Sequence, residues 1–287
     1  MKNNFVMFCK TYSADLNNFS LMIDSFNAFN EDNIKLFVSV PEKEINLYTK
    51  FNNKNISVIT DESYAGNFFT NKSYHGLSTG YINQEICKLS FWESNIAENY
   101  LCIDSDLQFI RKFYISDFMA DKNTPYTVLV MDKDLSIEKH YHDFWNFRQT
   151  FIKKIYDDIG LNDKRLRTCH GMQVLNSKVL KSLKKDFMTV KKYSYSDLIK
   201  ISPYEFTWYN AWFQKCKLIK EVAVEPFFKT FHMRIDYIFS KLKLLNLSDL
   251  SYSYIGIIMN SNWNNKHDKY TKTSFFYKKL YSLLKRL

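Results

Sequence analysis

The stretch Asn99–Ile110, NYLCIDSDLQFI, is an apolar run that stops at two aspartates, Asp104 and Asp106, and then becomes apolar again. A short and nearly continuous apolar run of this kind is typical of a strand buried inside a parallel sheet. The two carboxylates come directly after that strand, one residue apart. The pattern therefore predicts a pair of acidic side chains at the carboxyl end of a central strand.

The segments before this run alternate between strand and helix patterns. Strands are expected at 4–12, 34–41, 56–62 and 99–106, and helices at 13–30 and 81–97. This order predicts an α/β protein whose central sheet is mostly parallel and flanked by helices. Ligands of such sheets bind at the carboxyl ends of the strands. Several polar residues follow those ends and are expected to line one crevice: Thr11, Tyr12, Asp61, Glu62 and Asp104 to Asp106.

The second half of the chain is less regular. We expect a strand at 125–132, a helix at 143–161 that ends at Gly160, and a strand followed by a helix within 170–187. A further helix is expected at 202–216, with Ser202 as its N-cap and Pro203 at its first position.

The last residues carry a basic amphipathic pattern. We expect one domain at 1–262 and a helix at 263–287 whose apolar side faces away from most of its lysines. Such a helix lies on an anionic membrane surface, or it packs on the domain or on a partner subunit.

Composition restricts the class of partner. The 287 residues carry a formal net charge of +10, which suits a polyanion, an anionic membrane or an anionic small ligand. No nucleic-acid-binding motif is present, so nucleic acid is not an expected partner. The five cysteines form no CxxC pair, and no window has the pattern of a signal peptide or a membrane span. We expect a cytoplasmic protein, free or bound to the inner face of the cytoplasmic membrane.

The two aspartates indicate a divalent cation. Mg²⁺ and Mn²⁺ prefer oxygen ligands and often share their site with substrate phosphates. A cation held by carboxylates on one side and a diphosphate on the other stabilises that diphosphate as a leaving group. The alternative is a solvated turn without a ligand.

Five segments together resemble the GT-A fold (Rossmann-like), nucleotide-sugar-dependent glycosyltransferases. They are FVMFCKTYSADL, INQEICKLSFWE, YLCIDSDLQFIRKF, HGMQVLNSKVL and SPYEFTWYNAWF. The last is similar to the Ser-x-Tyr-Glu segment of a group of bacterial glycosyltransferase-like proteins, often associated with capsule or lipopolysaccharide synthesis. That group commonly has Ser-Glu-Tyr, whereas this chain has Ser202-Pro203-Tyr204. The resemblance covers roughly residues 3–262 and implies a single GT-A type domain with a C-terminal helical extension.

The resemblance implies a metal site and a donor site. Asp106 would bind Mn²⁺ or Mg²⁺ directly, and Asp104 would bind the metal through water or bind the ribose. His232 would be the third ligand, or else a packing histidine. The residues that would contact the nucleotide-sugar donor are Thr11, Tyr12, Asp61, Gln84, Lys88 and Asp104. Gln84 and Lys88 share one helix face, although an exposed helical lysine without a ligand is the common case.

The acceptor side is implied by two other segments. His170, Gly171 and Tyr204 would contact a glycan or lipid-linked glycan acceptor, with a loop or packing role as the alternative for His170. Glu205 is the candidate catalytic base, with Asp106 as its catalytic partner through the metal. An inverting transfer needs a carboxylate to take the proton of the acceptor hydroxyl. The alternative is an ordinary first-turn glutamate, which the helix dipole also favours.

The leading hypothesis is a metal-dependent hexosyltransferase-like enzyme of bacterial capsule, lipopolysaccharide or O-antigen synthesis. Two other classes remain open. A metal-dependent nucleotidyl- or phosphotransferase would share the α/β sheet, although the first loop, CKTYSADLNN, lacks the glycines of a phosphate-binding loop. A non-catalytic membrane-surface adaptor would use the basic C-terminal segment and would function without Asp106.

Overall fold

The computed structural model describes residues 2–131, 139–169, 171–231 and 246–259; the side chains of 139–144 are also outside the description. The chain divides into two units. The first comprises Met1–Thr230 and Asn246–Ile258. The elements discussed below belong to it, except for the last residues of two strands, Phe231 and Met259, which fall in the second unit. The predicted helix at 263–287 and the end of the predicted domain lie outside the described residues.

The central sheet has five strands in the order β3-β2-β1-β4-β7. Strands β1, β2, β3 and β4 run parallel, and β7 pairs antiparallel with β4. The bounds are β1 Asn3–Lys10, β2 Leu36–Val40, β3 Ile56–Thr60, β4 Ala97–Ile103 and β7 Val174–Asn176. The predicted α/β class and the mostly parallel sheet are confirmed.

The strands are buried in the pattern that a covered parallel sheet requires. Six consecutive residues of β1 are buried, and β4 has only one residue that is not. Phe8 of β1 stacks on Phe91 at 4.2 Å between ring centroids, and Phe91 packs edge-on against Tyr100 of β4 at 5.0 Å. The apolar runs at β1 and β4 therefore become two of the three inner strands of the sheet.

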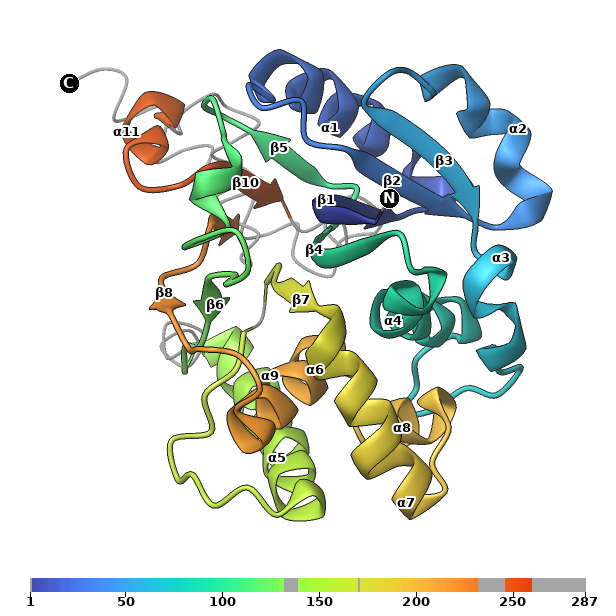
Figure 1. Cartoon of the computed structure of the whole chain (residues 1–287), viewed down its shortest axis with the longest axis vertical. Coiled ribbons are helices and arrows are strands. Elements are labelled where there is room, and N and C mark those ends of the chain that lie inside the picture. Colours follow the sequence, from blue (N-terminus) through green and yellow to red (C-terminus); the bar gives the residue numbers. More distant parts are fainter. Residues whose placement is uncertain (1, 132–138, 170, 232–245, 260–287) are drawn as a thin grey trace. The chain divides into compact units, whose positions relative to one another are not determined.

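Helices cover the sheet and extend beyond β7. Their bounds are α1 Leu16–Phe29, α2 Ile45–Tyr48, α3 Glu62–Ala65, α4 Thr79–Ser90, α5 Lys139–Ile159, α6 Ser177–Ser182, α7 Thr189–Lys191, α8 Tyr195–Ile201, α9 Glu205–Cys216 and α11 Leu247–Ser251. Figure 1 shows α5, α6, α8 and α9 gathered beside β7, while α1 and α2 lie with β2 and β3. Helix α5 ends at Ile159, and Gly160 follows with a φ of +66°, as predicted. Within the described residues, every helix is too short or too polar to span a bilayer.

Two smaller sheets flank the central one. Strands β5 Leu107–Phe109, β10 Gly256–Met259 and β9 Phe228–Phe231 form the first, in the order β5-β10-β9; β6 Thr127–Val128 and β8 Ala223–Val224 form the second. Gly256 is required where β10 meets β5, since a Cβ there would lie 2.6 Å from the backbone oxygen of Gln108. The strand predicted at 125–132 is shorter than expected, because β6 comprises only Thr127–Val128.

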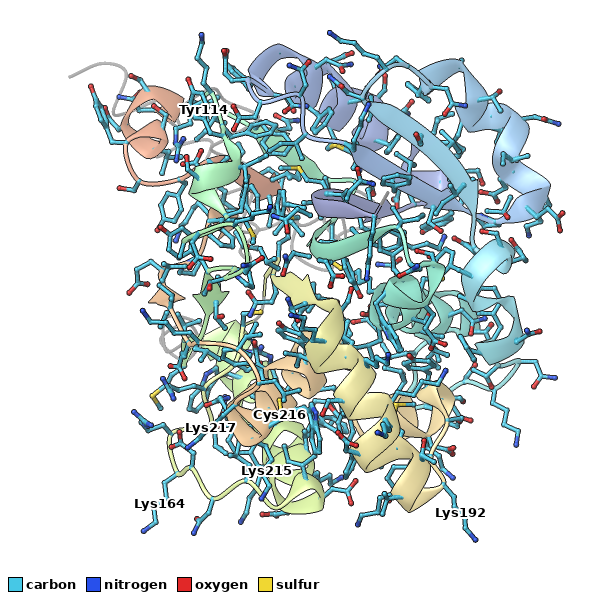
Figure 2. The ribbon with its side chains drawn as sticks, in the orientation of Figure 1. Tyr114, Lys164, Lys192, Lys215, Cys216 and Lys217 are labelled. Carbon is cyan, nitrogen blue, oxygen red and sulfur yellow. The ribbon has the colours of Figure 1, made fainter. Side chains whose placement is uncertain are left out.

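Two helices are each followed by a lysine whose backbone has the left-handed conformation. Lys192 follows α7 with a φ of 58°, and Lys217 follows α9 with a φ of 51°. Figure 2 shows Lys192 at the outer edge of the molecule's lower part, with Lys215 and Lys217 also in that part. A residue with a Cβ is strained in this conformation, whereas glycine is not.

We expect Lys217→Gly to stabilise the protein by about 1 kcal/mol, because it removes the left-handed strain at the end of α9. The measurement is the free energy of unfolding in urea. Lys217→Ala is the matched control, since it removes the charge and keeps the Cβ. An equal gain in the alanine variant would show that the charge, rather than the backbone, is responsible.

Candidate functional site

The two aspartates lie where the sequence placed them. Strand β4 ends at Ile103, Asp104 and Asp106 flank Ser105 in the following turn, and β5 begins at Leu107. The turn is closed by the Leu107 N–H, which donates to the Asp104 carbonyl at 3.2 Å. Ser105 is buried, whereas Asp104 and Asp106 are partly exposed, and the Asp104 side chain is 40% exposed. Both carboxylates therefore reach the surface at the carboxyl end of a central strand.

Lys88 connects Asp104 to Glu205. Its ammonium group lies 3.1 Å from Asp104 Oδ1 and 2.9 Å from Glu205 Oε1, to which it donates a hydrogen bond. The side chain comes from α4, whose residues from Glu85 to Ser90 are all buried. It also lies over the Phe206 ring, 5.3 Å from the centroid. Lys88 of α4 thus contacts two other predicted site residues, Asp104 just after β4 and Glu205 of α9.

Glu85 is a buried carboxyl group that the sequence analysis did not include. Its Oε2 atom lies 3.8 Å from the Lys88 ammonium, which is too far for a hydrogen bond. This oxygen atom has no hydrogen-bond partner among the described residues. The carboxyl groups of Glu85 and Glu205 share a hydrogen bond. The sequence did contain a signal, because Ile82, Glu85, Ile86 and Leu89 follow the apolar spacing of one helix face.

Burial and charge move the pKa values of this cluster in different directions. Burial, and then the neighbouring Glu205 carboxylate, raise the pKa of Glu85 well above its usual value. Burial also acts to raise the pKa of Glu205, but Lys88 and the hydrogen bond from Glu85 outweigh it and hold that pKa below the usual value. Burial acts to lower the pKa of Lys88, but Asp104 and Glu205 raise it well above the usual value. Glu205 and Lys88 are therefore an ion pair at neutral pH.

Another buried ion pair joins the ends of β1 and β3. Lys10 lies 3.0 Å from Asp61 Oδ2, and Asp61 Oδ1 accepts a hydrogen bond from Ser39 Oγ at 2.5 Å. Thr11 is fully buried, whereas Tyr12 is 44% exposed. Of the predicted donor-binding residues in these loops, Tyr12 therefore has a solvent-accessible ring, whereas the side chains of Asp61 and Thr11 are buried.

A third aspartate lies beside the turn. Asp15, just before α1, forms a side-chain hydrogen bond with Ser105. Burial raises its pKa, and the Asp104 carboxylate acts in the same direction. This contact places the loop after β1 against the turn after β4, which are the two loops predicted to meet the donor.

The predicted acceptor residues are partly described. Tyr204 is the residue before α9, and its ring packs on α5 between Phe151, at 5.8 Å, and the Arg148 guanidinium, at 5.6 Å. A Cβ on Gly171 would lie 3.6 Å from Thr230 Oγ1, so there is room for a small side chain. His170 lies outside the described residues. Gln84 is partly exposed on α4, one residue before Glu85.

The donor atoms at the β4 turn fit a hard divalent cation. Asp104 and Asp106 supply carboxylate oxygens at a partly exposed edge, as Mg²⁺ or Mn²⁺ prefers when water and phosphate complete the shell. In the part of the chain that the structure describes, no three His, Cys, Asp or Glu residues are grouped so as to hold a metal by themselves. His232, the predicted third ligand, lies outside that part.

A family profile described as "Family of unknown function (DUF6492)" matches residues 6–275. No curated protein matches the chain. Among solved structures, mouse xyloside xylosyltransferase 1 in its apo form is 10% identical, with a TM-score of 0.48 over 91% of this chain and 99% of that chain. The bifunctional glycosyltransferase WbbM, also apo, is 10% identical, with a TM-score of 0.46 over 91% of this chain and 46% of that chain. An active-site mutant of LgtC is 16% identical, with a TM-score of 0.42 over 82% of this chain and 77% of that chain. At these scores and identities, the likenesses assign no activity to this chain.

Proposed function

We propose that this chain, which belongs to the family of unknown function DUF6492, is a metal-dependent glycosyltransferase. It would move a sugar from a nucleoside-diphosphate donor to a glycan or lipid-linked glycan acceptor. The observation that carries the proposal is the contact of Lys88 with both Asp104, at the carboxyl end of β4, and Glu205, at the start of α9.

Each part of this arrangement has a role in sugar transfer. Asp104 and Asp106 would hold Mn²⁺ or Mg²⁺, which supplies charge stabilisation to the departing diphosphate. Tyr12, exposed beside the same edge, would stack on the nucleobase. In an inverting transfer, Glu205 takes the proton from the acceptor hydroxyl while the new glycosidic bond forms and the bond to phosphate breaks.

The biological setting follows from the sequence resemblance and is part of the proposal. The Ser-x-Tyr-Glu segment is similar to that of proteins associated with capsule, lipopolysaccharide or O-antigen synthesis. The expected location is the cytoplasm or the inner face of the cytoplasmic membrane. The basic segment 263–287, which would bind an anionic membrane, lies outside the described residues.

Calorimetric titration with a panel of nucleoside diphosphates and triphosphates, with and without Mn²⁺, tests the proposal. Wild type is expected to bind one nucleotide in a manganese-dependent way, and Asp106→Ala to lose at least about 100-fold in affinity, more than the loss of an outer-shell contact causes. Asp24→Ala is the matched control, since Asp24 is exposed on α1. It should bind as wild type does.

The other outcomes distinguish the rival classes. If folded wild type binds no nucleotide, the donor site is wrong and a non-catalytic adaptor is favoured. If nucleoside triphosphates bind far more tightly than diphosphates, a nucleotidyl- or phosphotransferase is favoured. If binding is unchanged by Asp106→Ala, the metal role of the two aspartates is wrong.

A further inference from the structure

We propose that Glu85 and Glu205 share one proton, which resides on Glu85, and that Glu85 is thereby a positioning residue for Glu205. The functional part of this inference rests on the proposed function, in which Glu205 takes the acceptor proton. The protonation itself follows from the geometry of the cluster and requires no ligand.

The number of charges is the first argument. Lys88 is one cation, and three carboxyl groups surround it, from Glu205 at 2.9 Å, Asp104 at 3.1 Å and Glu85 at 3.8 Å. Asp104 is partly exposed and can be compensated by water or by a cation. Glu85 and Glu205 are both buried, with 2% and 8% of their side chains exposed. Two adjoining buried carboxylates cannot both stay ionised with one ammonium group between them.

The contacts decide which carboxyl group keeps the proton. Glu205 accepts the hydrogen bond from Lys88 and occupies the first turn of α9, where backbone N–H groups favour an anion. Glu85 lies in the middle of α4 and has no hydrogen bond from Lys88. A hydrogen bond between two carboxyl groups requires a proton on one of them, and Glu85 is the donor that leaves Glu205 ionised.

The other titratable groups near the pair do not change this result. Burial first, and then the charges of the two glutamates, raise the pKa values of Tyr81 of α4 and Cys102 of β4, so both groups are neutral. Tyr204 before α9 has a raised pKa and is also neutral. The Arg148 guanidinium of α5 lies over the Tyr204 ring, 5.6 Å from its centroid. Lys88 is thus the only cation in hydrogen-bond contact with the pair among the described residues.

The shared proton has a consequence for the proposed transfer. The neutral Glu85 hydroxyl donates a hydrogen bond to the Glu205 carboxylate, and Lys88 donates to its Oε1. When Glu205 takes the proton of the acceptor hydroxyl, the O–H bond breaks and the acceptor oxygen bonds to the sugar, while the bond between sugar and phosphate breaks and the nucleoside diphosphate leaves with its electron pair. The pair of glutamates then holds two protons. Lys88 keeps Asp104 as its partner, so no uncompensated charge remains in the cluster.

Infrared spectroscopy of the unliganded full-length protein tests the proton directly. Wild type at neutral pH is expected to show the carbonyl stretching band of a buried, protonated carboxylic acid. Glu85→Gln should lose that band. Glu205→Gln should also lose it, because Glu85 then ionises as the partner of Lys88. Glu93→Gln, which removes the carboxylate that pairs with Lys184, is the matched control and should keep the band.

Thermal unfolding as a function of pH provides a second readout. The raised pKa of Glu85 means that folded wild type loses stability as pH rises above the usual value of 4.5, until Glu85 ionises. Glu85→Gln removes this loss, so its Tm relative to wild type should rise over the same pH range. Glu205 has a lowered pKa, so its ionisation adds stability as pH rises toward 4.5, and Glu205→Gln should lose Tm relative to wild type over that lower pH range.

A wild-type spectrum without the band, or a band that persists in Glu85→Gln, would overturn the inference. Should Glu205→Gln fail to fold, the comparison of wild type with Glu85→Gln still decides. Neither readout uses a nucleotide, so a failed nucleotide titration would reject the glycosyltransferase proposal and leave the shared proton standing.

Discussion

Replacing Lys88 with methionine is expected to destabilise the protein by about 3–5 kcal/mol. Methionine keeps most of the apolar stem and removes the ammonium group, including its position over the Phe206 ring, so the loss is that of the charge. The Glu205 carboxylate would remain buried without its cation, and its hydrogen bond from Lys88 would be gone. Urea unfolding measures the effect, and metal-dependent nucleotide binding should fall with it because Lys88 also contacts Asp104.

The double variant Lys88→Met/Glu205→Gln is the control. It removes both charges, so we expect it to recover a large part of the lost stability, since the cost arises from one unpaired buried charge. A Lys88→Met variant within about 1 kcal/mol of wild type would show that water reaches the cluster and compensates Glu205.

Trp208→Ala is expected to destabilise the protein by about 3–5 kcal/mol, because Trp208 is a fully buried aromatic side chain. The indole packs on Phe187, at 6.0 Å between ring centroids. Its N–H donates to the carbonyls of Leu198, at 3.1 Å, and Ser202, at 3.2 Å. These bonds hold the end of α8 against α9 and so position Tyr204 and Glu205.

Trp208→Phe separates packing from hydrogen bonding. It keeps most of the ring and loses the N–H, so a cost of about 1–3 kcal/mol is expected for the two carbonyls left without that donor. Denaturant unfolding of the two variants gives the comparison. Equal costs in both would mean that the hydrogen bonds, and not the buried ring, account for the effect.

The sequence predicted the first half of the fold well because each element there has one clear period. The apolar runs in β1 and β4 are continuous, and the apolar residues of α1 recur at helical spacing. The short strands β5 and β10 were not predicted. Each is only a few residues long, and they pair with each other across a large separation in the chain.

The predicted start of the helix at 202–216 was wrong. Ser202 closes α8 rather than capping α9, and α9 begins at Glu205 with Tyr204 before it. The residue before a proline favours an extended backbone, as Ser202 has with a φ of −153°, and the Trp208 indole holds its carbonyl. That tertiary contact, which no local pattern contains, decides where the helix begins.

The site was predicted only in part for a related reason. Asp104, Lys88 and Glu205 could be selected because each follows a local rule: a strand end, a helix face and a first helical turn. Their mutual contact depends on how α4 and α9 pack, which the sequence does not specify. The position of Glu85 on an apolar helix face indicates that it is buried, but not that it meets Glu205 and Lys88.

Because Lys88 lies within 3.1 Å of Asp104 and within 2.9 Å of Glu205, a cation at the first carboxylate and a proton at the second are thermodynamically linked ligands. If Asp104 held the proposed cation, the Lys88 ammonium group would shift toward Glu205, and the affinity of Glu205 for a proton would fall. By reciprocity, a proton on Glu205 releases the ammonium group toward Asp104 and weakens the cation there by the same factor. The two ligands are antagonists, so sugar transfer onto an acceptor would itself loosen the cation that holds the departing diphosphate.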